Sequence, residues 1–87
     1  MQRLHAQRVH LSIGYRDEFR KYNPTAAKRY TYWNQLNPKI RENNSGWRID
    51  YFLTSDRLKT KKCEILDNIY GSDHCPIYLE LMLDLFI

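Results

Sequence analysis

Bulky apolar side chains occur at every second position from Trp47 to Leu53, and Arg48 and Asp50 lie between them. A period of two places one set on each face of an extended chain. The pattern therefore predicts a β-strand over residues 47–53, with the four bulky side chains on one face and Arg48, Asp50 and Phe52 on the other.

Three further segments have the composition of strands. Residues Tyr30–Trp33 are rich in aromatic side chains, which favour β-structure. Residues Lys62–Leu66 and Ile77–Leu83 are short apolar or alternating runs of ordinary strand length. Strand signals therefore dominate the second half of the chain.

Helical signals are weak and are concentrated in the first half. Residues 2–12 carry a weak helical pattern that Gly14 can end. Residues Asp17–Tyr22 favour a single helical turn, stopped at Asn23-Pro24 because the residue before a proline avoids the helical region. We expect only short helices from these segments.

Two segments contain turn signals. Residues Asn34–Ser45 are polar and contain Pro38, which predicts a loop. Residues Ser55–Leu58 begin with a serine that can cap a short helical turn.

Composition narrows the class of protein. Fourteen Lys and Arg residues against ten Asp and Glu give a net charge of +4, which favours a polyanionic partner but fits a basic surface serving only solubility equally well. Cys63 and Cys75 form neither a disulfide framework nor a zinc-binding spacing, so we expect both to be reduced and packed. The apolar run from Leu79 to Ile87 is interrupted by acidic residues and is too short to span a bilayer. We expect an intracellular protein with no membrane partner.

Two blocks carry residues suited to phosphate chemistry. The block Gly71–Pro76 contains Asp73, a hard oxygen ligand suited to Mg²⁺, next to His74, which can exchange a proton near neutral pH. The block Gly46–Phe52 contains Asp50, which can hold an imidazole in one tautomer. Taken alone, each of these side chains fits an ordinary surface residue; the two blocks in this order are far more specific.

These blocks, with Ile13–Arg20 and Arg29–Trp33, resemble the C-terminal part of the exonuclease III-type AP endonucleases, in the endonuclease/exonuclease/phosphatase superfamily. The resemblance is collinear and covers about three quarters of the chain. A Ser-Asp-His-x-Pro ending also occurs in other branches of the superfamily, and the Gly-Trp-Arg-Ile-Asp-Tyr-Phe block points to the AP endonucleases. The implied fold is α/β: the mostly antiparallel C-terminal portion of a four-layer sandwich, as an incomplete domain.

The resemblance also implies the catalytic residues. His74 corresponds to the catalytic imidazole and Asp50 to its carboxylate partner. Asp73 corresponds to a ligand of Mg²⁺ or Mn²⁺. The implied reaction is hydrolysis of the phosphodiester bond on the 5′ side of an abasic site in double-stranded DNA, in base excision repair.

An apolar pocket for a flipped-out abasic deoxyribose is implied at Tyr32, Trp47 and Ile49. Such a pocket excludes a normal nucleotide by its size, and flipping costs least where pairing and stacking are already lost. Aromatic residues in strands more often form the core, which is the alternative for these positions. Of the three positions, Trp47 is the best supported by the resemblance.

Length limits what this sequence can do by itself. The chain has 87 residues, and we expect all of them, residues 1–87, to form the C-terminal part of a single domain of this superfamily. The N-terminal half, which the family needs for the remaining metal ligands, has no counterpart here, so we expect no activity from this chain alone. The alternatives are a catalytically inactive DNA- or protein-binding fragment and another phosphodiesterase of the superfamily. The resemblance implies the nucleus in a eukaryote and the cytoplasm in a bacterium.

Overall fold

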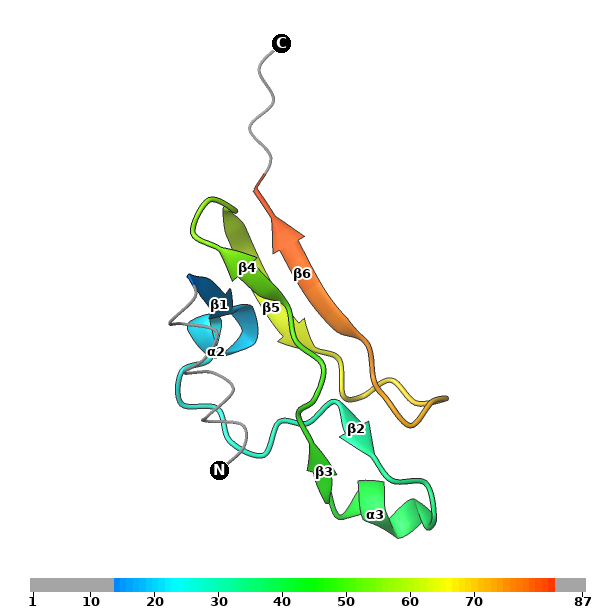
Figure 1. Cartoon of the computed structure of the whole chain (residues 1–87). Helices are drawn as coiled ribbons and strands as arrows, with labels where there is room; N and C mark the ends of the chain where they lie inside the picture. The colour runs from blue at the N-terminus through cyan, green and yellow to red at the C-terminus, as the bar shows by residue number, and fades with distance from the viewer. Residues whose placement is uncertain (1–13, 83–87) are drawn as a thin grey trace.

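The structure, a computed structural model, describes residues 14–82. Within this range the chain forms two short helices and six strands. In chain order they are β1 (Tyr15–Asp17), α2 (Glu18–Tyr22), β2 (Tyr32–Trp33), α3 (Pro38–Glu42), β3 (Gly46–Trp47), β4 (Leu53–Ser55), β5 (Thr60–Ile65) and β6 (Ile77–Leu81) (Figure 1). The helical pattern predicted for residues 2–12 lies outside the described residues.

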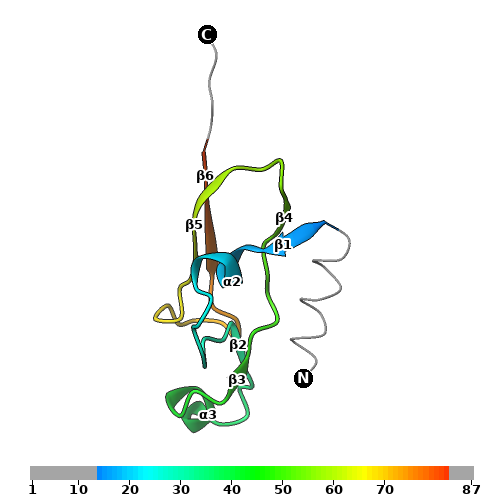
Figure 2. The ribbon, with the colours of Figure 1, turned by 90° about the vertical axis from the view of Figure 1, so that its left-hand side faces the viewer.

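The strands of residues 14–82 pair into three antiparallel two-stranded sheets, β1 with β4, β2 with β3 and β5 with β6. The β5–β6 hairpin is the longest and places Cys63 opposite Leu79 and Ile65 opposite Ile77. Figures 1 and 2 show α2 beside β5, whereas β2, β3 and α3 gather at one end of the molecule. A mixed α/β architecture with antiparallel strands confirms the predicted fold class.

The predicted strands in the second half are present with slightly different ends. Strand β5 begins two residues before the predicted segment Lys62–Leu66, and β6 covers Ile77–Leu81 of the predicted Ile77–Leu83. Strand β2 occupies the last two residues of Tyr30–Trp33.

Helix α2 begins and ends where the sequence predicts. The Asp17 side chain caps the first turn by accepting a hydrogen bond from the Arg20 amide at 3.3 Å. At the other end, the Asn23 side-chain amide donates to the Phe19 carbonyl at 3.0 Å. Both helices are five residues long. No helix in the described part of the chain has the length and apolar character needed to cross a membrane.

The hydrophobic core is small. Its buried apolar residues are Phe19, Trp33, Cys63, Ile65 and Cys75. Both cysteines are free and buried, as predicted. Burial, together with the nearby carboxylate of Glu18, raises the pKa of Cys63 to about 11, and burial also raises the pKa of Cys75. The two thiols therefore remain protonated at neutral pH and pack as small apolar groups.

A buried ion pair joins β1 to the segment after β3. Arg48 donates from Nη1 to Asp17 Oδ1 at 3.0 Å and from Nη2 to Asp17 Oδ2 at 2.5 Å, and both side chains are almost fully buried. Next to it, the fully buried Glu18 accepts hydrogen bonds from the hydroxyls of Thr54 and Thr60. Buried charges are tolerated only where they are paired or hydrogen-bonded, and these contacts meet that condition.

The prediction of one strand over residues 47–53 is wrong. Strand β3 ends at Trp47, β4 begins at Leu53, and the residues between them form no strand. The predicted faces are also wrong, because Trp47 is 64% exposed whereas Arg48 is 3% exposed.

Polar contacts to distant residues explain this departure. Arg48 turns inward to reach Asp17, which lies 31 residues earlier in the chain. The amides of Ile49 and Asp50 donate to the side-chain hydroxyl of Thr31 at 3.1 and 3.2 Å. These amides are thus satisfied without a partner strand, and the chain is free to leave the extended conformation.

Two turn predictions also need correction. The predicted loop Asn34–Ser45 contains α3, which Asn37 caps by accepting a hydrogen bond from the Lys39 amide at 2.9 Å, with Pro38 in the first turn. Residues Ser55–Leu58 form a single turn, closed by a hydrogen bond from the Leu58 amide to the Ser55 carbonyl at 3.2 Å, and no helical turn.

Candidate active site

Backbone pairing brings the loop before β6 against β2. The Trp33 amide donates to the Asp73 carbonyl at 3.0 Å, and the Cys75 amide donates to the Thr31 carbonyl at 2.9 Å. Between these bonds, Tyr32 and His74 pair as an isolated antiparallel bridge. His74 is therefore fixed opposite Tyr32, although more than 40 residues separate them in the sequence.

The structure brings Asp50 and His74 together. Asp50 Oδ2 lies 2.7 Å from His74 Nδ1, with the side chains 36% and 42% exposed. Thr31 lies behind both residues: it is fully buried, its hydroxyl holds the Asp50 amide, and its carbonyl holds the amide that follows His74. Sequence reasoning missed Thr31, because nothing in a β-branched residue between two tyrosines indicates that it joins these segments.

The Asp50–His74 contact defines what the imidazole can do. With Asp50 ionised, Nδ1 carries the hydrogen and donates it to the carboxylate, which leaves Nε2 as the nitrogen available to a ligand. A neutral ring then accepts a proton at Nε2, and a protonated ring donates from Nε2 to an oxygen anion. Because the pair is partly exposed, a substrate can reach it.

Asp73 is exposed and sits in a tight turn before His74. The Ser72 hydroxyl lies 3.3 Å from Asp73 Oδ1 and also accepts a hydrogen bond from the His74 amide at 3.3 Å. Gly71 has φ +125°, a conformation that other residues rarely adopt. Within residues 14–82, no three Asp, Glu, His or Cys side chains lie close enough together to hold a metal ion. Asp73 is thus an exposed carboxylate that belongs to no such cluster among the described residues.

Of the three residues singled out in the sequence as a sugar pocket, Tyr32 lies against His74. Tyr32 has its ring centroid 5.0 Å from that of His74 and pairs across the β2–β3 ladder with Trp47. Trp47 is 64% and Ile49 50% exposed. Trp47 and Ile49 are therefore exposed rather than part of the core, and Trp47 lies opposite Tyr32, the residue beside the imidazole.

Comparison with known proteins shows that this chain is similar to part of several nucleases. No family model matches the chain. An exodeoxyribonuclease from Streptococcus pneumoniae is 43% identical over 73 residues, covering 82% of this chain and 26% of the relative. The DNA repair nuclease APEX1 of Danio rerio is 42% identical over 73 residues, covering 82% of this chain and 23% of the relative.

Solved structures agree with the sequence comparison. The AP endonuclease LMAP from Leishmania major superposes with a TM-score of 0.75 at 36% identity, over 82% of this chain and 22% of that protein. The match lies in the C-terminal part of such structures. The chain therefore spans about a quarter of the length of the relatives it matches.

Proposed function

We propose that this chain, which is homologous to the C-terminal part of the exonuclease III-type AP endonucleases, supplies the histidine–aspartate half of a DNA-repair nuclease site. The substrate is double-stranded DNA containing an abasic site, cleaved at the phosphodiester bond on the 5′ side of that site. The observation that carries the proposal is the 2.7 Å contact between Asp50 and His74, at an exposed position.

His74 acts on the phosphoryl group. Its Nε2 is the ring nitrogen that Asp50 does not occupy, so it can donate to a phosphoryl oxygen as negative charge develops there. Asp50 holds the ring in one orientation and stabilises its protonated form. The imidazole therefore needs little rearrangement when the substrate arrives.

A divalent cation, Mg²⁺ or Mn²⁺, is the proposed cofactor, with Asp73 as one of its ligands. Asp73 fits this role because it is an exposed carboxylate whose contact within the described residues is a weak one with Ser72. When bound, such an ion neutralises charge on the phosphoryl oxygens and activates water. The remaining ligands lie elsewhere in the complete site, since residues 14–82 contain no cluster of three candidate ligands.

Tyr32, Trp47 and Ile49 are proposed to receive the abasic deoxyribose. A sugar without its base is small, and the apolar surface beside His74 gives it a place next to the group that acts on its phosphate. Trp47 has the largest and most exposed side chain of the three.

Alone in Mg²⁺, this chain is expected to show no cleavage of an abasic-site duplex above a buffer control. The reason is that Asp73 is a single metal ligand without the others needed to hold the ion. The measurement is incision of a labelled duplex, with an intact duplex as the control. Metal-dependent cleavage that co-purifies with the chain and is lost in His74→Ala would show that the chain carries a complete site.

A "completed enzyme" makes the residue roles testable. In it, this chain replaces the matching 73 residues of the Streptococcus pneumoniae exodeoxyribonuclease. There, Trp47→Ala is expected to reduce the preference for abasic over intact duplex by about 10-fold or more while leaving the Mg²⁺ dependence unchanged, because the loss of apolar contact costs roughly 1–3 kcal/mol. Tyr78→Ala, which removes a half-exposed ring on β6, is the matched control. Equal effects of the two variants would refute the proposed role of Trp47.

The second candidate function is a catalytically inactive piece that binds DNA or protein. The exposed side chains of Trp47 and Ile49 give such a piece an apolar surface for a partner without any metal. The completed enzyme separates the two candidates: a chain that retains a working site restores incision there, and a decayed one does not.

A further inference from the structure

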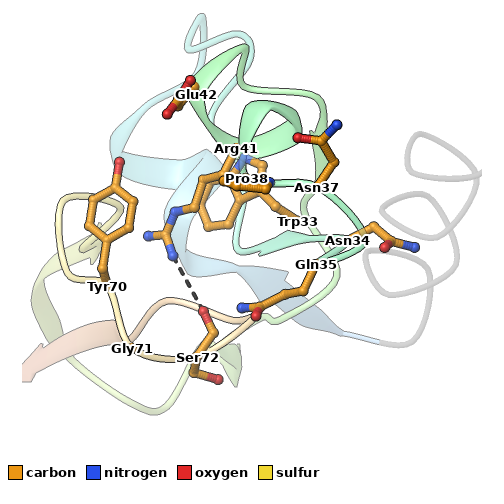
Figure 3. Close-up of a pocket in the computed structure, with 10 residues that line it drawn as sticks. All are labelled: Trp33, Asn34, Gln35, Asn37, Pro38, Arg41, Glu42, Tyr70, Gly71 and Ser72. Carbon is orange, nitrogen blue, oxygen red and sulfur yellow. Dashed lines mark hydrogen bonds between the residues drawn. The ribbon is translucent and has the colours of Figure 1, made fainter.

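A pocket of about 440 Å³ lies between α3 and the loop that leads to the candidate site. The indole of Trp33 forms its floor, residues of α3 form one wall, and Tyr70 to Ser72 form the opposite wall (Figure 3). Asp73 and His74 follow directly after this second wall. A contact that joins these two walls therefore also fixes residues 70–72, which lead directly to the candidate site.

Arg41 spans this gap. Its guanidinium carbon lies 4.2 Å from the ring centroid of Trp33 and 3.8 Å from that of Tyr70, so the cation is stacked between two aromatic rings. Figure 3 shows the guanidinium reaching from α3 toward Ser72. One side chain thus connects the helix to the loop.

The same guanidinium donates to three backbone carbonyls spread along the loop. Nη2 donates to the Asp67 carbonyl at 3.1 Å and to the Ile69 carbonyl at 2.8 Å, and Nη1 donates to the Ser72 carbonyl at 3.3 Å. The loop has few backbone bonds of its own here, such as that from the Ile69 amide to the Leu66 carbonyl at 3.2 Å. Arg41 therefore supplies much of what fixes residues 67–72.

Arg41 complements the backbone pairing on the other side of the loop. The Trp33 amide holds the Asp73 carbonyl, and Trp33 also lies against the Arg41 guanidinium. The turn carrying Asp73 and His74 is thus held from both directions. Ser72 connects the loop to His74, since its carbonyl accepts from Arg41 and its hydroxyl accepts from the His74 amide, each at 3.3 Å.

We propose that Arg41 is a positioning residue that clamps the loop 67–72 and so keeps His74 against Asp50. It touches no reacting group itself. The proposal rests on the proposed function for its biological meaning, but it predicts a geometry that can be observed without any nuclease activity. Lysine cannot replace it, because an ammonium has neither the planar fork that reaches several carbonyls nor the flat face that stacks between rings.

The test is the tautomer of the His74 ring, observed by ¹H–¹⁵N correlation spectra of the full chain at a pH where the ring is neutral. In the wild-type chain we expect distinct nitrogen shifts, with hydrogen on Nδ1 because Asp50 accepts from it. In Arg41→Lys we expect these shifts to move toward the average of two exchanging tautomers. Arg29→Lys is the matched control: Arg29 also holds the start of this loop, through Asp67 Oδ2 and the Ile65 carbonyl, each at 2.9 Å, but makes no bond to residues 69–72.

Three results would overturn the proposal. They are averaged shifts in the wild-type chain, unchanged shifts in Arg41→Lys, or the same change in Arg29→Lys as in Arg41→Lys. If Arg41→Lys does not fold, Tyr70→Leu decides, because it removes one stacked ring at a 69% exposed position and keeps all three hydrogen bonds. We expect Tyr70→Leu to shift the tautomer in the same direction by a smaller amount, and wild-type shifts in that variant would refute the clamp.

Discussion

His74→Ala is expected to lower the rate of abasic-site incision by the completed enzyme about 10²–10⁴-fold, the usual contribution of a general acid–base group. The variant removes the ring nitrogen proposed to contact the developing phosphoryl charge and leaves the backbone pairing of His74 with Tyr32 intact. The measurement is the single-turnover incision rate at saturating Mg²⁺, which reports the chemical step rather than product release.

Asp50→Asn belongs to the same prediction and is expected to be nearly as severe. The amide fills the same volume but carries no charge to stabilise the protonated ring, and it no longer fixes the tautomer. Asp56→Asn, in the turn after β4, is the matched control because it makes the same chemical change at an exposed position. An Asp50→Asn enzyme as active as Asp56→Asn would show that the 2.7 Å contact has no part in the reaction.

Arg48→Met is expected to destabilise the fold by about 3–5 kcal/mol, since it leaves the buried Asp17 carboxylate without its partner. Small domains are stable by only about 5–15 kcal/mol, and this chain has a small core, so a loss of this size is a large fraction of the total free energy of unfolding. The measurement is denaturant unfolding followed by circular dichroism.

The control for this prediction is Arg29→Met. Arg29 pairs with Asp67 at 2.9 Å, but both side chains are more than a third exposed, so the loss should be at most about 1 kcal/mol. Equal losses from the two variants would mean that burial does not distinguish the two ion pairs. Arg48 lies two residues before Asp50, so the ion pair also anchors the segment that carries the carboxylate proposed to hold His74.

Local signals in the sequence predicted local structure well. The helical turn predicted over Asp17–Tyr22 and its stop at Asn23-Pro24 placed α2 correctly, because the signal that ends the helix acts within one helical turn. The cap at Asn37, followed by a proline, was an equally local signal for α3, but the polar composition of residues 34–45 obscured it.

Long-range contacts explain what the sequence pattern could not predict. Alternation over residues 47–53 suggested a strand, but the inward turn of Arg48 depends on Asp17, and the bonding of the Asp50 amide depends on Thr31. Both partners lie outside residues 47–53, so the alternation within that segment carries no information about them. The two blocks containing Asp50 and His74 were identified by their resemblance to a family, and the structure shows them in contact.

A double-mutant cycle on incision by the completed enzyme decides whether Asp50 and His74 act as one unit in a nuclease site. The rates to compare are those of the wild type, His74→Ala, Asp50→Asn and the double variant, at one saturating Mg²⁺ concentration. Because Asp50 acts through the imidazole, the account predicts that the double variant is no slower than His74→Ala alone. A double variant slowed by the product of the two single effects would contradict it.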